Sequence, residues 1–168
     1  MKILLSALLL LVSGGVRADP VEQLIPMQTF GARTYYIDTE IPGAGKHSML
    51  VDTGSAYSVI NEETLAELSS TGQAQFIKQL RGRMADGSER RVPLYRIAAI
   101  NLGGSCLIKD VDVAIINGNS RQIIGISTLM RAAPFGMSFD PPVLSLNQCV
   151  QNEQQASLEN DKNLLTIQ

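Results

Sequence analysis

The sequence predicts a mostly β protein with one or two short helices, folded as one domain. From Thr34 onward, short apolar runs alternate with turn residues, which is the pattern of consecutive antiparallel strands. The 168 residues include 14 glycines and 7 prolines but no tryptophan, and 45% are hydrophobic, which suits a turn-rich β protein better than a helical bundle. A chain of this length leaves no room for a second full domain.

Residues 1–18 have the pattern of an export signal. Lys2 provides the positive start, residues 3–12 form the apolar stretch, and the Val-Arg-Ala run at 16–18 forms a small-x-small cleavage site. The alternative is an uncleaved membrane anchor. That reading is less favoured because residues 3–16 are shorter than the roughly 20 residues that cross a bilayer and contain serine and glycine.

Cleavage after the signal leaves a domain over residues 19–149 and a polar tail over residues 150–168. Removing Lys2 and Arg17 from the 14 basic residues leaves 12 against 16 acidic ones, a net charge of about −4. This charge disfavours nucleic acid and anionic lipid as partners, and we expect no stable membrane insertion once the signal is removed.

Cys106 and Cys149 are the two cysteines of the chain. In an oxidising, exported compartment an even pair is expected to form a disulfide. Two unrelated buried thiols are the alternative. Together with the single histidine, His47, these cysteines cannot supply the four ligands of a structural zinc site, so we expect no metal and no other cofactor.

Two strands lead to Asp52. Residues 35–41 form the first strand, and the Pro-Gly-Ala-Gly run at 42–45 provides a turn. Residues 48–51 then return toward Asp52, so its carboxylate is expected where a strand ends.

A short helix is expected after this aspartate. Asn61 is a good N-cap, and Glu62 and Glu63 suit the positive end of the helix dipole. Leu65 and Leu68 give the helix an apolar stripe and extend it to about residue 68.

The rest of the domain predicts three hairpins, a short buried run and one or two helical turns. The turn of the first hairpin is Asp86-Gly87, a dipeptide that accepts the positive φ angles of a tight turn. The expected segments are strands 76–84 and 90–97, strands 97–102 and 107–116, the buried run 123–125, helical turns at 127–132, and strands 137–139 and 143–146. In the tail, residues 164–167 are a candidate terminal strand.

The run from Leu50 to Ser55 is the most informative local pattern. A strand buried through Leu50 and Val51 would present the Asp52 carboxylate rigidly, and Gly54 lets the backbone turn sharply. The hydroxyl groups of Thr53 and Ser55 can hydrogen-bond neighbouring groups without adding charge.

These segments resemble the retropepsin family of aspartic peptidases, and specifically its bacterial members, over about residues 34–146. The run at 51–60, VDTGSAYSVI, looks like the catalytic loop of that family, with Asp52 as catalytic residue and Thr53, Gly54 and Ser55 as its support. The other matching segments are Met84, Ala85, Asp86 and Gly87, which look like the tip of a substrate-binding flap, and Ile123, Ile124 and Gly125, followed by Leu129, which look like the segment packed beneath the active site.

The resemblance implies a closed β-barrel of the retropepsin type with a flap hairpin. It also implies hydrolysis of peptide bonds by a water held between two carboxylates, one of which acts as general base while the other donates a proton. Two close carboxylates share one proton because they cannot both ionise easily. With the export signal, the resemblance implies a periplasmic protein.

One chain supplies one such aspartate. Asp86-Gly87-Ser88 lacks the hydroxyl residue between Asp and Gly, and it lacks a preceding apolar pair. We therefore expect a homodimer that places Asp52 and its mate at a two-fold axis. Its peptide or protein substrate would add as a strand to the flap edge. Apolar specificity pockets are expected near Met84, Ile124 and either Leu50 or Val59.

Other classes of protein fit less well. The second aspartate or the lysine of haloacid-dehalogenase and P-type ATPase loops is absent, and Gly125-Ile126-Ser127 lacks the second glycine of a serine-hydrolase elbow. Two alternatives stay open. One is a binding module that holds a periplasmic peptide or protein without cutting it, and the other is a monomer that becomes active only when two chains are brought together.

Several polar residues have simpler interpretations. His47 fits a polar position near the start of the strand that leads to Asp52, and Asp86 fits a turn former rather than an acid. Four arginines, at 81, 83, 90 and 91, surround the flap turn and are most simply a solvated face. Attraction of acidic substrates is the weaker interpretation of these arginines.

Overall fold

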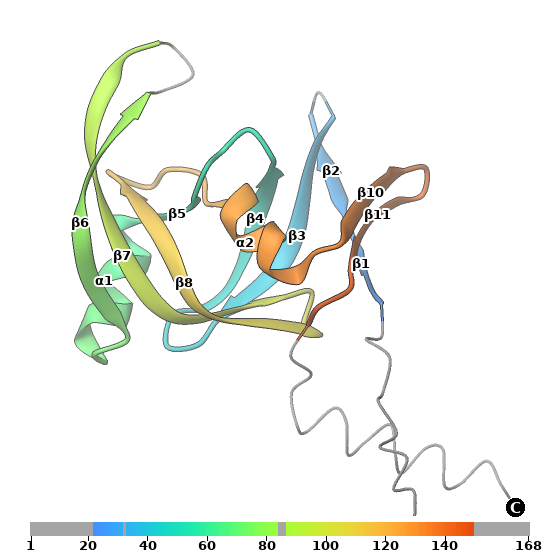
Figure 1. Ribbon diagram of the computed structural model, residues 1–168, viewed down its shortest axis with the longest axis horizontal. Coiled ribbons are helices and arrows are strands. Elements are labelled where there is room, and N and C mark those ends of the chain that lie inside the picture. Colours follow the sequence, from blue (N-terminus) through green and yellow to red (C-terminus); the bar gives the residue numbers. More distant parts are fainter. Residues whose placement is uncertain (1–21, 32, 84–86, 150–168) are drawn as a thin grey trace, which may run out of the picture.

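A computed structural model describes residues 22–31, 33–83 and 87–149 of the chain. The expected signal at 1–18, the tail at 150–168 and its candidate strand lie outside the described residues. Figure 1 shows a large curved sheet, a smaller sheet beside it and short helices packed against the large one. Within the described residues, no helix is long and apolar enough to span a membrane.

The predicted mostly β architecture is confirmed. The large sheet has eight strands, which lie side by side in the order β2 (Gln28–Phe30), β3 (Thr34–Ile41), β4 (Gly45–Asp52), β9 (Ile123–Gly125), β5 (Ser58–Asn61), β8 (Cys106–Ile116), β7 (Glu89–Leu102) and β6 (Ala74–Arg83). The small sheet has the order β1 (Gln23–Pro26), β11 (Pro142–Leu146) and β10 (Phe135–Phe139). The helices are α1 (Glu62–Ser70), α2 (Ile126–Leu129) and the single 3₁₀ turn η1 (Met130–Ala132).

The barrel is not fully closed, which corrects the expectation of a closed one. Strands β3 and β7 meet through two residue pairs, Thr39 with Leu102 and Glu40 with Asn101. Strands β2 and β6 remain the outer strands of the sheet. The short β3–β7 contact therefore joins the sheet at one end and leaves the β6–β7 hairpin free to extend from it (Figure 1).

Helix α1 begins as predicted. The side chain of Asn61 accepts a hydrogen bond from Thr64 N at 2.9 Å, which satisfies one of the free amides of the first turn. Leu68 is fully buried in the core, while Glu62 and Glu63 lie in the first turn and are exposed.

Strand β7 is longer than predicted. The sequence suggested two strands meeting at Ile97, whereas residues 89–102 form one strand that pairs with β6 along its first half and with β8 along its second. Strands β1 and β2 were not predicted at all. Met27 separates them, and β1 pairs with β11 from the far end of the domain.

The large sheet buries apolar side chains on both of its faces. The main core includes Val51 and Ile124, and Ile124 is fully buried. A second, smaller cluster on the opposite face contains Val59, Val92 and Ala114. Side chains alternate between the two faces along each strand, so neighbouring residues of β5 and of β9 belong to different clusters.

A disulfide joins Cys106 at the start of β8 to Cys149 at the end of the described domain, with a sulfur–sulfur distance of 2.08 Å. The bridge spans a sequence separation of 43 residues. Cys106 is fully buried in the main core, and Cys149 packs against that core. The bridge therefore fixes the chain just beyond β11 to the turn between β7 and β8.

Candidate active site

Asp52 is the last residue of β4, at the edge where this buried strand ends. Strand β9 runs parallel beside it, and the paired residues are Leu50 with Ile123, Val51 with Ile124 and Asp52 with Gly125. Asp52 is half-buried, and its Oδ1 accepts a hydrogen bond from Gly54 N at 2.9 Å. Within the described residues its Oδ2 accepts no hydrogen bond, so one carboxylate oxygen is fixed and the other is free.

The loop after Asp52 is fixed by backbone contacts. Ser55 N donates to Asp52 O at 3.2 Å, and the Ser55 hydroxyl donates to Tyr57 O at 2.8 Å. Ile126 N donates to Ser55 O at 2.9 Å, which ties the loop to the start of α2. Thr53 is exposed, and its hydroxyl has no partner in the described part of the chain, so of the two expected hydroxyl contacts only that of Ser55 is present.

A buried hydroxyl pair supports this loop from below. The Ser58 and Thr128 hydroxyl oxygens lie 2.7 Å apart, and Gly125 N donates to Ser58 Oγ at 3.0 Å. Both side chains are almost completely buried. The sequence analysis included Ser58 in the run that resembles the catalytic loop but gave it no role, and it did not single out Thr128. The available signal was a serine next to the aliphatic pair Val59-Ile60, where a buried hydroxyl requires a partner.

Gly125 is required by this close packing. A Cβ atom built on it would collide with the carbonyl group of Tyr57 and would lie 2.8 Å from Ser58 N. Ile123, Ile124 and Gly125 thus lie beside the Asp52 strand, where the sequence pattern placed them.

Asp52 faces the smaller apolar cluster rather than the main core. Leu50 precedes Asp52 by two positions, so the two side chains project from the same face of β4. Leu50 pairs with Ile123, and Ile123 pairs with Val59 of that cluster. The expectation that Ile124 borders a pocket is wrong, because Ile124 is buried in the main core on the opposite face.

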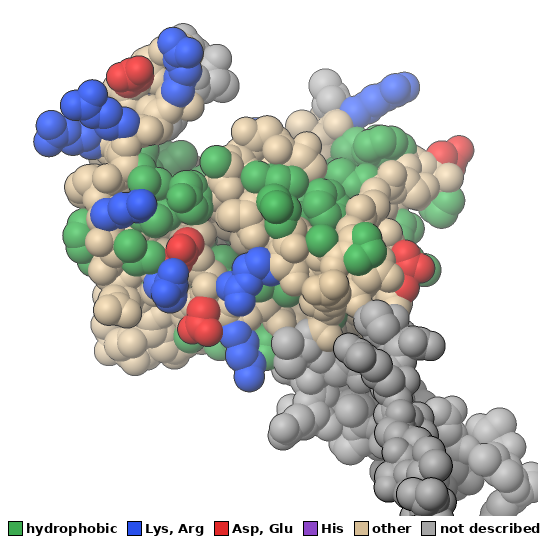
Figure 2. Space-filling model, viewed as in Figure 1, with side chains coloured by type: hydrophobic (Ala, Val, Ile, Leu, Met, Phe, Trp, Pro, Cys, Tyr) green, Lys and Arg blue, Asp and Glu red, His purple; other side chains and the backbone are tan. Residues whose placement is uncertain are grey.

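The β6–β7 hairpin is the predicted flap segment. Its strands pair from Ala74 with Ile97 to Arg83 with Glu89, and Gly87 has the expected positive φ of +81°. Met84, Ala85 and Asp86 lie outside the described residues. Figure 1 shows the outer ends of β6 and β7 on the same side of the molecule as the loop after β4, and Figure 2 shows a notch between the hairpin and the neighbouring body.

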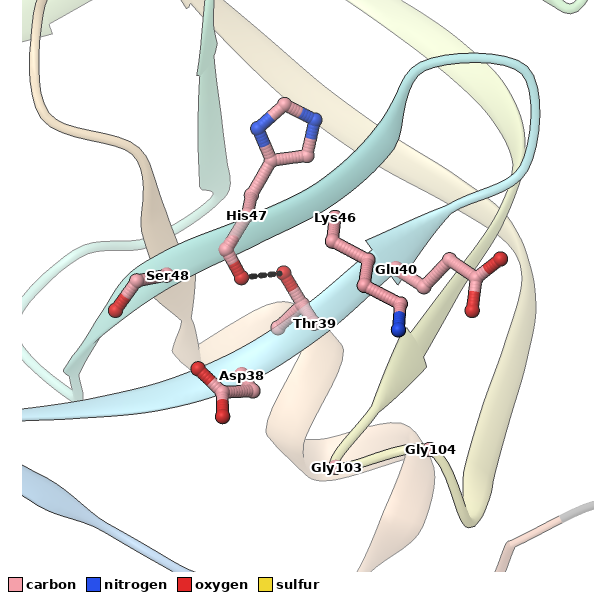
Figure 3. Close-up of a pocket in the computed structure, with 8 residues that line it drawn as sticks. All are labelled: Asp38, Thr39, Glu40, Lys46, His47, Ser48, Gly103 and Gly104. Carbon is pink, nitrogen blue, oxygen red and sulfur yellow. Dashed lines mark hydrogen bonds between the residues drawn. The ribbon is translucent and has the colours of Figure 1, made fainter.

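A separate hollow of about 550 Å³ lies on β3 and β4, away from Asp52. Its lining includes Asp38, Glu40 and Lys46, and Thr39 Oγ1 donates to His47 O at 3.1 Å (Figure 3). The ring of His47 points away from Asp38 and Glu40 in this view. The hollow is open, and neither Asp52 nor any residue of its loop lines it. We therefore do not assign peptide hydrolysis to this hollow.

His47 has a structural role. Its Nε2 lies 2.9 Å from Ala44 O and its Nδ1 lies 2.9 Å from the side-chain nitrogen of the buried Gln122. With Nε2 carrying the hydrogen, the ring donates to the carbonyl oxygen and accepts from the amide of Gln122. These contacts link the β3–β4 turn to the segment before β9, in keeping with the interpretation of His47 as a polar strand residue.

The described residues contain few ion pairs and no evident metal site. No group of three or more His, Cys, Asp or Glu side chains there is arranged to hold a metal ion. The ion pair between Arg96 and Asp112, 2.8 Å from nitrogen to oxygen, raises the pKa of Arg96 and lies on the exposed face of β7 and β8. What the site offers is therefore one carboxylate held rigidly beside an apolar surface.

A mostly β fold that carries a single Asp-Thr-Gly-Ser loop at the end of a buried strand is typical of aspartic peptidases. Comparison of the sequence with protein-family models matches residues 37–131 to the family described as "gag-polyprotein putative aspartyl protease", and the chain belongs to this family. A search of curated protein sequences finds no match.

The fold is also similar to a solved structure. The crystal structure of a retropepsin-like aspartic protease from Rickettsia conorii matches 77% of this chain and 94% of its own, with a TM-score of 0.56 and 16% sequence identity. At that identity the match establishes the retropepsin-like fold and leaves activity to be argued from the site.

Proposed function

We propose that the protein is an aspartic endopeptidase in which the Asp52 carboxylates of two chains activate one water. The observation that carries this proposal is the state of Asp52: the carboxylate is held at a strand end by Gly54 N, with its second oxygen unoccupied within the described residues. A rigid carboxylate with one free oxygen is suited to orient a water. Family membership and fold support the same chemistry.

The reaction needs a proton donor as well as a proton acceptor. In a two-fold dimer, the ionised Asp52 takes a proton from the water while the water oxygen bonds to the peptide carbonyl carbon. The protonated Asp52 of the partner donates its proton to the carbonyl oxygen, which gives a neutral gem-diol. The first Asp52, now protonated, then donates its proton to the amide nitrogen while the ionised Asp52 of the partner takes a proton from one gem-diol hydroxyl, so that the carbon–nitrogen bond breaks and acid and amine products are released.

The substrate would be an extended peptide. The β6–β7 hairpin presents an unpaired edge at β6, and main-chain hydrogen bonds to a flap strand are a common way to bind extended peptides. The apolar side chains of Leu50, Ile123 and Val59, which share the face of Asp52, would contact substrate side chains.

Export to the periplasm completes the proposal. The signal pattern at residues 1–18 directs the chain out of the cytoplasm. The Cys106–Cys149 disulfide supports an oxidising destination, since such bridges persist mainly in exported proteins.

The test is replacement of Asp52 by Asn in a peptide-library cleavage assay between acidic and neutral pH. The change is isosteric and keeps an oxygen for Gly54 N, so folding should change by less than about 1 kcal/mol while cleavage falls at least about a thousandfold. Asp38→Asn is the matched control, because it makes the same exchange on an exposed part of β3 and should leave cleavage intact.

Equal cleavage by wild type and Asp52→Asn would reject the assigned role. Sedimentation of the protein provides a second check, since the mechanism needs two chains for one site. A monomer at every concentration at which cleavage occurs would contradict the dimer, and a monomer without any cleavage would favour the binding-module alternative.

A further inference from the structure

The tip of the β6–β7 hairpin carries unbalanced positive charge. Four arginines stand there against two acidic residues in the sequence, Glu89 in the described part and Asp86 outside it; the arginines are Arg81, Arg83, Arg90 and Arg91. In the described part of the chain none of the four takes part in an ion pair. Figure 2 shows blue side chains gathered on this hairpin, although the whole chain has a net charge of −2.

Placing these arginines close together lowers the stability of the hairpin. Arg81 and Arg91 lie directly opposite each other on the paired strands, and like charges in that position repel. Positive side chains on the outer strand β6 discourage pairing with other sheets, which accounts for Arg81 and Arg83. Arg90 differs from these two residues because it lies on β7 and its side chain projects from the other face of the hairpin.

Strand register assigns the faces. Arg81 pairs with Arg91, so these two share one face; Leu80 pairs with Val92, and Gly82 pairs with Arg90. Because side chains alternate along a strand, Arg90 shares its face with Val92 and Leu80, while Arg91 points the opposite way.

The face of Arg90 is the face of the candidate site. Val92, two positions along β7, packs in the cluster with Val59 and Ala114, and Ile123 packs against the same cluster. Ile123 pairs with Leu50, whose side chain projects from β4 on the same side as that of Asp52. Arg90 is therefore the arginine that faces the notch between the hairpin and the loop after β4.

The position of Arg90 leaves room for a ligand. Its partner across the hairpin is Gly82, which has no side chain, and Arg90 itself is exposed. A guanidinium group beside an apolar wall suits a carboxylate that is carried on a partly apolar peptide, because it can donate two parallel hydrogen bonds to that carboxylate.

We propose that Arg90 is a specificity-determining residue that selects peptides with a Glu or Asp side chain facing the flap. This inference rests on the proposed peptidase function for its physiological meaning, but peptide binding alone can test it. In a two-fold dimer each flap would present one Arg90, so the acidic preference would occur at two positions, one on either side of the cleaved bond.

Binding is measured first, with the Asp52→Asn variant and two fluorescent octapeptides, (Val-Glu)₄ and (Val-Gln)₄. Glu and Gln have the same shape, and alternation places every acid on one face of an extended chain. We expect the Glu peptide to bind roughly three- to tenfold more tightly at low salt. Adding Arg90→Gln should bring that ratio to about one, whereas adding Arg91→Gln should leave most of it, because Arg91 makes the same charge change on the opposite face.

Equal binding of the two peptides would overturn the proposal. So would an equal loss of the ratio in the Arg90→Gln and Arg91→Gln variants, since that result would indicate only the general field of the hairpin. Cleavage by wild type is scored separately. A wild type that cuts no peptide contradicts the peptidase function, while the binding ratio still decides the role of Arg90.

If wild type does cut, Gln is exchanged for Glu at each position of a cleaved peptide in turn. The exchange should raise kcat/KM roughly threefold or more at two positions that flank the cleaved bond.

Discussion

Gly125 N donates a hydrogen bond of 3.0 Å to the hydroxyl oxygen of Ser58, which lies 67 positions earlier in the chain. Gly125 is also the residue paired with Asp52 across the parallel strands β9 and β4. The buried serine thus fixes the strand that lies beside the candidate catalytic carboxylate. Two of the predictions below concern what holds this arrangement in place.

Ser58→Ala should destabilise the protein by about 2 kcal/mol, because it leaves Gly125 N and the Thr128 hydroxyl buried without a partner. Cleavage should fall roughly tenfold or more, since the loop after Asp52 loses support. Chemical unfolding and kcat/KM measure the two effects. Ser138→Ala, at an exposed position of β10, is the control and should change stability by less than about 0.5 kcal/mol; equal effects of the two changes would refute the role of Ser58.

Gly125→Ala should destabilise the protein by roughly 2 kcal/mol or more, because the added methyl group collides with the backbone of Tyr57. The φ angle of Gly125 is −89°, so backbone strain is not the cause. In the control Gly72→Ala the methyl group meets nothing within 4 Å, but φ is +69°, and a loss of about 1 kcal/mol is expected from the backbone alone. A fully stable Gly125→Ala protein would show that the packing is wrong.

The sequence was informative where a local pattern decides the structure. Asn61 as N-cap, the positive φ angle of Gly87 and the largely buried run from Ile123 to Gly125 follow from short-range rules, and the structure confirms each of them. The position of Asp52 at a strand end could also be predicted, because the apolar pair Leu50-Val51 precedes it directly.

Non-local contacts could not be predicted. Strand β1 is four residues long, contains Pro26 and exists through its pairing with β11, more than a hundred positions later. The pairing of Thr39 with Leu102, which joins the sheet at one end, likewise has no local signal. The face to which Ile124 points depends on its register with β4, and a shift by one residue exchanges the two faces of a strand.

Loss of the disulfide should destabilise the domain by about 4 kcal/mol, the chain-entropy estimate for a closed loop of this length. Replacing Cys106 and Cys149 together by Ala removes the bridge, which has a sequence separation of 43 residues. The free energy of unfolding is measured with and without a reducing agent. Wild type should lose stability on reduction and the double variant should not respond; a wild type indifferent to reduction would mean that the bridge contributes nothing to stability.

The most direct test of the two-chain site is to mix wild type with Asp52→Asn under conditions of free subunit exchange. If one site needs Asp52 from both chains, adding an equal amount of the variant should reduce the cleavage rate to about half at constant wild-type concentration, because half of the wild-type chains then pair with an inactive partner. An unchanged rate, under conditions in which mixed dimers are shown to form, would mean that each chain acts alone and would contradict the account.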